Sequence, residues 1–250
     1  MKNWYLVNPN NIPFGMFSLL VVLISLTFYI QNIEVLRFVL FLAVPLFAIF
    51  YFFKIKSLSV PALCFLLSSF LANSLSLFFV ENSPLYIINV LCLVAILSLV
   101  FIVYKEFIEY QLSKWLMIYL WAMFAISLCF LFEITRVFSG LIVKNTEVYV
   151  FFLQGLGLIV LGLLALGMCL VDEQKGKSPI FLFMAVLCFA FSLSISYIAN
   201  YYVYNWFFEP LDKLFYVSGL YLMIKYALSE GKPQKPIEEY EVLYSEVVAP

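Results

Sequence analysis

Serine and asparagine side chains form a short polar stripe inside one of the long apolar runs of this chain. Ser69, Asn73 and Ser76 are four and three residues apart, so a helix places all three on one face. Their hydroxyl and amide groups form hydrogen bonds but supply neither a strong acid nor a strong base. Such groups are costly in an apolar environment unless they are paired, so the stripe indicates either a ligand cavity or hydrogen bonding between helices.

A second polar stripe lies in a later apolar run. Ser192, Ser196 and Asn200 repeat every four residues, and Ser194 lies between them. We predict that the two stripes line one cavity that binds a ligand. The alternative interpretation is ordinary hydrogen bonding between packed helices, which is worth about 0.6 kcal/mol per bond on average in membranes.

One pair of opposite charges stands at the edge of an apolar run. Glu133 and Arg136 are three residues apart, and a continuing helix would let their side chains meet. The pair could act as a substrate clamp or a charge relay. A single Glu–Arg pair specifies no reaction, so we interpret it as an interfacial ion pair.

Several kinds of chemistry are excluded by what the chain lacks. It contains no histidine, which removes His-based catalytic triads and His-ligated zinc. Its five cysteines all fall inside apolar runs without CxxC spacing, as is typical of buried apolar side chains. Lys and Arg (14) nearly balance Asp and Glu (15), so no basic excess favours nucleic acid. We predict no catalytic residue, no metal and no cofactor.

The elements that hold these residues are predicted from composition. Of the 250 residues 65% are hydrophobic and only 12% are charged, whereas soluble domains carry about 25% charged residues. Crossing a bilayer takes about 20 apolar residues in a helix. The sequence therefore predicts an all-α polytopic transmembrane bundle with eight spans. They are Phe14–Ile30, Leu36–Phe53, Leu58–Val80, Leu85–Tyr104, Trp115–Phe132, Val148–Val171, Ile180–Tyr204 and Leu211–Leu228.

The charges between the spans predict the orientation. Ten of the 14 Lys and Arg residues fall on the side of the two termini, which places both termini in the cytoplasm. We expect the membrane to be a bacterial inner membrane. Asp212, Lys213 and Lys225 are expected at the membrane interfaces. Residues 1–228 form the transmembrane domain, and residues 229–250 are expected to be a mobile acidic cytoplasmic tail.

Four short strings within the spans carry a family resemblance. Residues 41–46 read Phe-Leu-Ala-Val-Pro-Leu, residues 69–75 Ser-Phe-Leu-Ala-Asn-Ser-Leu, residues 191–196 Phe-Ser-Leu-Ser-Ile-Ser and residues 215–220 Phe-Tyr-Val-Ser-Gly-Leu. With its layout over residues 14–228, the chain resembles the YhhN group, the lysoplasmalogenase-like membrane proteins. The resemblance implies an eight-helix fold and cleavage of the vinyl ether bond of lysoplasmalogens.

The same resemblance implies that the catalytic groups are missing. The lysine of the family falls on Val44, its two aspartates on Asn73 and Ile195, and its glutamine on Gly219, while its histidine has no counterpart. An asparagine cannot protonate an enol ether as a carboxylic acid can. We therefore expect a non-catalytic protein that binds a membrane lipid or another amphiphile, with Gly219 added to the cavity candidates.

Other functions stay open at this point. The high aromatic content favours a structural or assembly subunit that binds other membrane-protein subunits. An active hydrolase of the lysoplasmalogenase type is a further alternative. Transporters usually carry repeats, broken helices or intramembrane charges, none of which the sequence shows clearly.

Overall fold

The computed structural model describes residues 12–54, 59–78, 85–108, 110, 112–140, 145–171, 179–203 and 205–229. All regular secondary structure in these ranges is helical, so the predicted all-α class is confirmed. The helices are α1 (Ile12–Ile30), α2 (Ile33–Lys54), α3 (Val60–Phe78), α4 (Leu85–Phe107), α5 (Lys114–Ser139), α6 (Asn145–Val171), α7 (Pro179–Tyr201) and α8 (Phe208–Ser229).

Seven of these helices, α1 to α7, are long and apolar enough to cross a membrane. They indicate a multi-pass integral membrane protein. The eighth, α8, has a lower mean hydropathy because it carries charged residues, among them Asp212 and Lys213. Helix α5 continues to Ser139, well past the predicted end at Phe132, so Glu133 and Arg136 lie within it. The predicted tail, residues 229–250, lies outside the described residues apart from Ser229, which ends α8.

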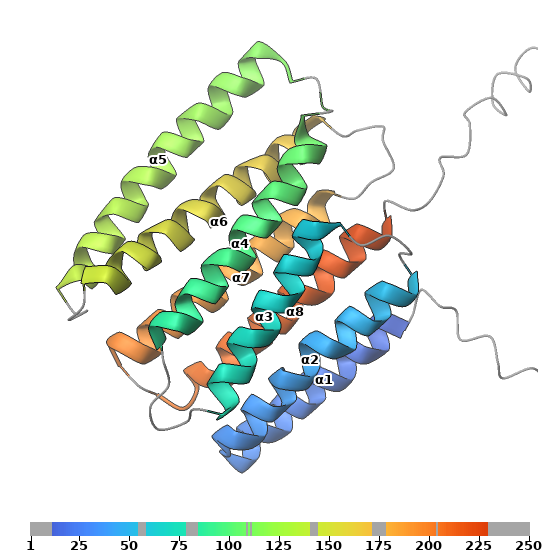
Figure 1. The fold of residues 1–250 in the computed structure, drawn as a ribbon. Helices are drawn as coiled ribbons and strands as arrows, with labels where there is room; N and C mark the ends of the chain where they lie inside the picture. The colour runs from blue at the N-terminus through green and yellow to red at the C-terminus, as the bar shows by residue number, and fades with distance from the viewer. Residues whose placement is uncertain are drawn as a thin grey trace, which may run out of the picture.

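Six helices form a ring, and the other two pack on its outside. Around the ring, α2 packs against α3, α3 against α4, α4 against α6, α6 against α7, α7 against α8, and α8 against α2. Helix α1 packs outside α2 and α8, while α5 packs on α6 at the opposite edge of the molecule (Figure 1). Among the described residues, no Cα of α3 or α4 lies within 8 Å of a Cα of α7 or α8. The centre of the ring therefore contains side chains and the space between them, but no helix backbone.

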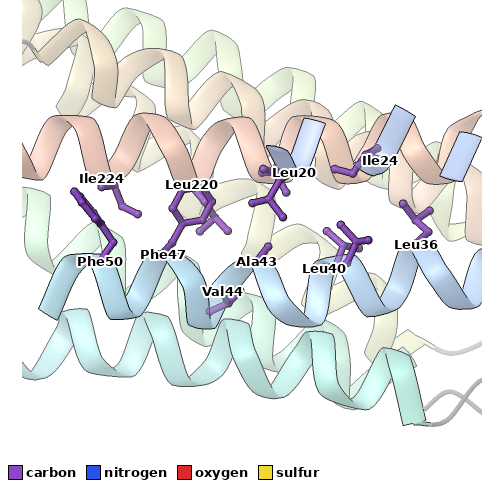
Figure 2. Close-up of a cluster of buried hydrophobic side chains, with 12 residues drawn as sticks. Leu20, Ile24, Leu36, Leu40, Ala43, Val44, Phe47, Phe50, Leu220 and Ile224 are labelled. Carbon is purple, nitrogen blue, oxygen red and sulfur yellow. The ribbon is translucent and has the colours of Figure 1, made fainter. Parts of the chain in front are cut away.

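Apolar side chains hold the two sides of the ring together. One cluster joins α1, α2 and α8 through residues such as Leu20, Phe47 and Leu220, which are almost fully buried (Figure 2). A second cluster joins α4, α6, α7 and the end of α8, with Leu161 and Leu182 at its centre. These clusters join the helices on both sides of the ring, and α8 takes part in both.

Small residues on α6 let the neighbouring helices approach closely. A Cβ at Gly157 would lie 2.7 Å from Cγ2 of Ile96 on α4, so only glycine fits there without a shift of that side chain. Gly162 faces Val186 on α7 at a normal packing distance. Helix α6 therefore packs closely against its two neighbours in the ring, α4 on one side and α7 on the other.

Candidate functional site

A cavity of about 150 Å³ lies between α3, α4, α7 and α8. Its deeper part is apolar and includes Ile96, Phe189 and Leu193. Polar residues from all four helices also line it, among further apolar ones such as Ile88 and Ala72. The polar lining residues are Ser69, Asn73, Ser76, Asn89, Ser192, Ser196, Asp212, Lys213 and Tyr216. The cavity is therefore amphipathic, as a site for a ligand with a polar and an apolar part would be.

An ion pair between neighbouring residues of α8 forms the charged part of this site. The Nζ of Lys213 lies 2.5 Å from Oδ2 of Asp212. Ser192 on α7 donates a hydrogen bond to the other carboxylate oxygen, Oδ1, also at 2.5 Å. Asp212 is only 4% exposed, and a buried carboxylate needs such partners to offset its loss of hydration. The arrangement holds a fixed pair of opposite charges against the cavity.

A smaller cavity of about 90 Å³ adjoins the first and shares six lining residues with it: Ser76, Ile88, Asn89, Ser196, Asp212 and Lys213. This second cavity lies where α3 and α7 end and where α4 and α8 begin. It adds further charged and polar residues to the site. These added residues are Arg37, Asn200 and Glu209. We call this region the polar mouth of the site.

Arg37 is held in the polar mouth by a contact from α2 to α3. Its Nη1 donates a hydrogen bond to the backbone oxygen of Ser76 at 3.0 Å. The guanidinium group carries further N–H groups in a planar fork, which suits bidentate binding of an anionic oxygen pair. With Lys213, Asp212 and Glu209, Arg37 gives the mouth and the adjoining cavity two positive and two negative charges.

A polar contact crosses the ring from α3 to α8. The Nδ2 of Asn73 lies 3.3 Å from the hydroxyl oxygen of Tyr216 and 2.9 Å from the backbone oxygen of Ser69, to which it also donates. Asn73 thus presents its amide group to the cavity and reaches the opposite side. Hydroxyl and amide groups at this position can exchange their mutual hydrogen bonds for bonds to a ligand.

A buried network behind the cavity supports the wall formed by α4. Gln154 on α6 is fully buried, and its Nε2 donates to the backbone oxygen of Asn89 at 2.6 Å. Tyr197 on α7 donates from its hydroxyl to Oε1 of Gln154 at 3.1 Å. Because both ends of the Gln154 amide are used, the network ties α4, α6 and α7 together at the level of the site.

The structure brings most of the predicted cavity residues together. Ser69, Asn73, Ser76, Ser192 and Ser196 line the central cavity, and Asn200 lines the polar mouth.

Two predicted cavity residues lie elsewhere. Ser194 is exposed and donates to the backbone oxygen of Ala190 within its own helix. Gly219 is buried under the ring of Phe189, where an added Cβ would lie 2.7 Å from a ring carbon. The role of Gly219 is thus to admit an aromatic ring.

Glu133 and Arg136 lie away from the cavity. Both are exposed on α5, which contacts the ring only through α6. In the described part of the chain the two side chains form no ion pair with each other. Glu133 and Arg136 are therefore not part of the candidate site.

Asp212, which was expected at a membrane interface, is buried among the helices and lines the cavity. Spacing along the sequence could not show this, because the partner Ser192 lies 20 residues away on another helix. A charged residue inside a span is itself a signal of a functional site, and it could have found Asp212.

Sequence reasoning also missed Cys92 and Tyr216, which line the cavity between more apolar neighbours. A single polar residue in an apolar run has no partner at helical spacing, so the sequence does not show which face of the helix it lies on. In the described residues no three His, Cys, Asp or Glu side chains are grouped as metal ligands. The polar groups present suit hydrogen bonding, charge pairing and proton exchange.

Comparison with models of known protein families, with curated proteins and with solved structures finds no match for this chain.

Proposed function

We propose that α8 is an eighth membrane span and that the site is built around it. Its 22 residues reach about 33 Å, which is enough to cross the hydrocarbon core of a bilayer. Asp212 and Lys213 line the cavity, so their charges do not exclude α8 from a bilayer. The start of α1 and the end of α8 lie at the same end of the bundle, as an even number of spans requires (Figure 1).

The orientation follows from the distribution of basic residues. With both termini in the cytoplasm of a bacterial inner membrane, the polar mouth faces the outer side, because it lies at the opposite end from the start of α1. A ligand would then enter from the outer leaflet or from the aqueous phase beyond it.

The protein binds a single-chain amphiphile in the central cavity. The observation that carries this proposal is the position of the buried Asp212–Lys213 pair at one side of a cavity whose deeper lining is apolar. The polar head of the ligand would replace water at Asp212, Lys213 and Arg37, and its chain would contact Phe189 and Ile96. The resemblance to lysoplasmalogenase-like proteins agrees with a ligand of this kind.

Equilibrium binding of a fluorescent monoacyl lipid to the full chain in detergent tests the proposal. Asp212→Asn removes the negative charge of the buried pair, leaves Lys213 without this partner, and should weaken binding about tenfold or more. Glu133→Gln makes the same chemical change on the exposed face of α5 and should leave binding unchanged. Equal affinity of both variants and the unchanged protein would contradict the proposal.

A second candidate function is hydrolysis of the vinyl ether bond of a lysoplasmalogen. The observation that favours it is the carboxyl group of Asp212 within the cavity, since the resemblance alone had indicated that no carboxylate remained there. In its protonated form the carboxyl group could donate a proton to the enol ether carbon and take one back from the water that adds to the resulting oxocarbenium ion. The hemiacetal so formed would then break its C–O bond, which releases the fatty aldehyde and leaves the hydroxyl group on the glycerol. Release of fatty aldehyde from lysoplasmalogen by the purified protein, and its loss in Asp212→Asn, would establish this activity. A rate equal to the blank would exclude it.

A further inference from the structure

A third cavity lies on the far side of the site from the polar mouth. It has a volume of about 90 Å³ and lies between α2, α3, α4 and α8. Most of its lining is apolar, including Phe47, Ala62 and Met223. At its far end Tyr226 donates a hydrogen bond from its hydroxyl to Oε2 of Glu106 at 2.5 Å. We call this space the inner cavity and the one at Asp212 the outer cavity.

Phe65 on α3 and Leu99 on α4 line both cavities. These two side chains therefore form the partition between the outer and the inner cavity. Neither presents a polar group, so a hydrocarbon chain could pass between them without breaking a hydrogen bond. The two cavities and the partition follow the same helices α3, α4 and α8 along the length of the bundle.

The spacing along α4 gives the length of this path. Cys92 lines the outer cavity and Glu106 lines the inner one, and 14 residues of helix separate them, which is about 20 Å. That distance is comparable with an extended long-chain alkyl tail. Along this path the lining residues are charged and polar at Asp212 and apolar at the partition. They stay mostly apolar through the inner cavity, up to the Glu106–Tyr226 pair.

We propose that the inner cavity is a tail site, and that the chain of the bound amphiphile passes between Phe65 and Leu99 to reach it. This inference rests on the proposed amphiphile binding at Asp212. It assigns to the protein a preference for ligands with one long unbranched chain, because the two cavities meet at an apolar partition formed by two side chains. Phe65 and Leu99 are then the residues that determine which chains are accepted.

Binding of a series of monoacylglycerols, from monocaprin to monostearin, tests the inference with one variant and one matched control. Ala62 lines only the inner cavity, so Ala62→Leu fills the tail site without altering the outer one. It should weaken binding of monostearin about tenfold or more and leave monocaprin within about twofold, since each buried methylene contributes to affinity. Ala122→Leu makes the same change on the exposed face of α5 and should alter neither.

A measurement on the unaltered protein makes the test independent of how Ala62→Leu folds. A stearoyl probe with a diazirine at the end of its chain should modify residues of the inner cavity, such as Met223, on illumination. A probe with the diazirine beside its head group should modify residues of the outer cavity. Peptide mass spectrometry locates both modifications.

The possible outcomes separate the two proposals. If no monoacylglycerol binds to the unaltered protein, the proposed function fails, and the tail site fails with it. If binding occurs but Ala62→Leu weakens all chain lengths equally or none, only the tail site is overturned. Modification of outer-cavity or surface residues alone by the end-labelled probe would likewise overturn it.

Discussion

Ser192 on α7 donates a hydrogen bond to the carboxylate of Asp212 on α8, with 2.5 Å between the two oxygen atoms. Both residues are buried, and both line the central cavity. The bond fixes one carboxylate oxygen while Lys213 contacts the other. A cavity wall that contains a charge is therefore fixed in place by a contact between neighbouring antiparallel helices.

Removing the hydroxyl of Ser192 should destabilise the protein. In Ser192→Ala the Asp212 carboxylate loses a charge-assisted hydrogen bond, for which we expect a loss of about 1.5–3 kcal/mol in the free energy of unfolding. Ser194→Ala is the matched control on the same helix, because the hydroxyl of Ser194 is exposed and bonds only to Ala190. Denaturant unfolding in detergent, followed by tryptophan fluorescence, measures both. Similar losses in the two variants would contradict the role of Ser192.

Breaking the ion pair should cost more than removing it altogether. Asp212→Asn leaves Lys213 beside the cavity without its counter-ion, and we expect a loss of about 2 kcal/mol in stability. The double variant Asp212→Asn with Lys213→Met removes both charges and should recover most of that loss. The unfolding midpoints of the single and double variants give the comparison. A double variant less stable than Asp212→Asn would show that the charges are not coupled.

The helices themselves could be predicted because apolar runs separated by short polar segments are a local property of the sequence. Each predicted span coincides with one helix, including α8 despite its charges. Helix α5 was predicted too short because Glu133 was taken as its boundary, whereas the helix continues through Glu133 and Arg136 on an exposed face. Charge marks the edge of an apolar run more reliably than it marks the end of a helix.

The site could be predicted only where a helical period reveals one face. Ser69, Asn73 and Ser76 follow that period and line the cavity, as do Ser192 and Ser196. Ser194 breaks the period, since two residues turn a helix by about 200°, and it faces away. The partners of Asp212 depend on how α7 packs against α8, which no pattern within either helix records.

Gly219 should not tolerate a methyl group. A Cβ there would lie 2.7 Å and 2.9 Å from two ring carbons of Phe189, so Gly219→Ala should cost about 1–3 kcal/mol through overpacking. Gly15 on α1 has no heavy atom within 4 Å of the same position, and Gly15→Ala should be neutral or slightly stabilising. Thermal unfolding in detergent gives both values. Adding Phe189→Leu to Gly219→Ala should restore part of the lost stability. If the double variant is no more stable than Gly219→Ala, the contact with Phe189 is not the cause of the loss.

The orientation of the site predicts which cysteines a membrane-impermeant maleimide can reach. In a full-length chain whose five native cysteines are replaced by alanine, Asn205→Cys places a thiol in the exposed connection between α7 and α8, near the polar mouth. It should be labelled in intact cells, because the mouth is proposed to face outwards. Ser59→Cys, exposed before α3 at the other end of the bundle, is the matched control and should be labelled only after the membrane is permeabilised. The reverse labelling pattern would show that the protein has the opposite orientation in the membrane and that the polar mouth faces the cytoplasm. Labelling of both thiols in intact cells would rule out an arrangement in which these two connections lie on opposite sides.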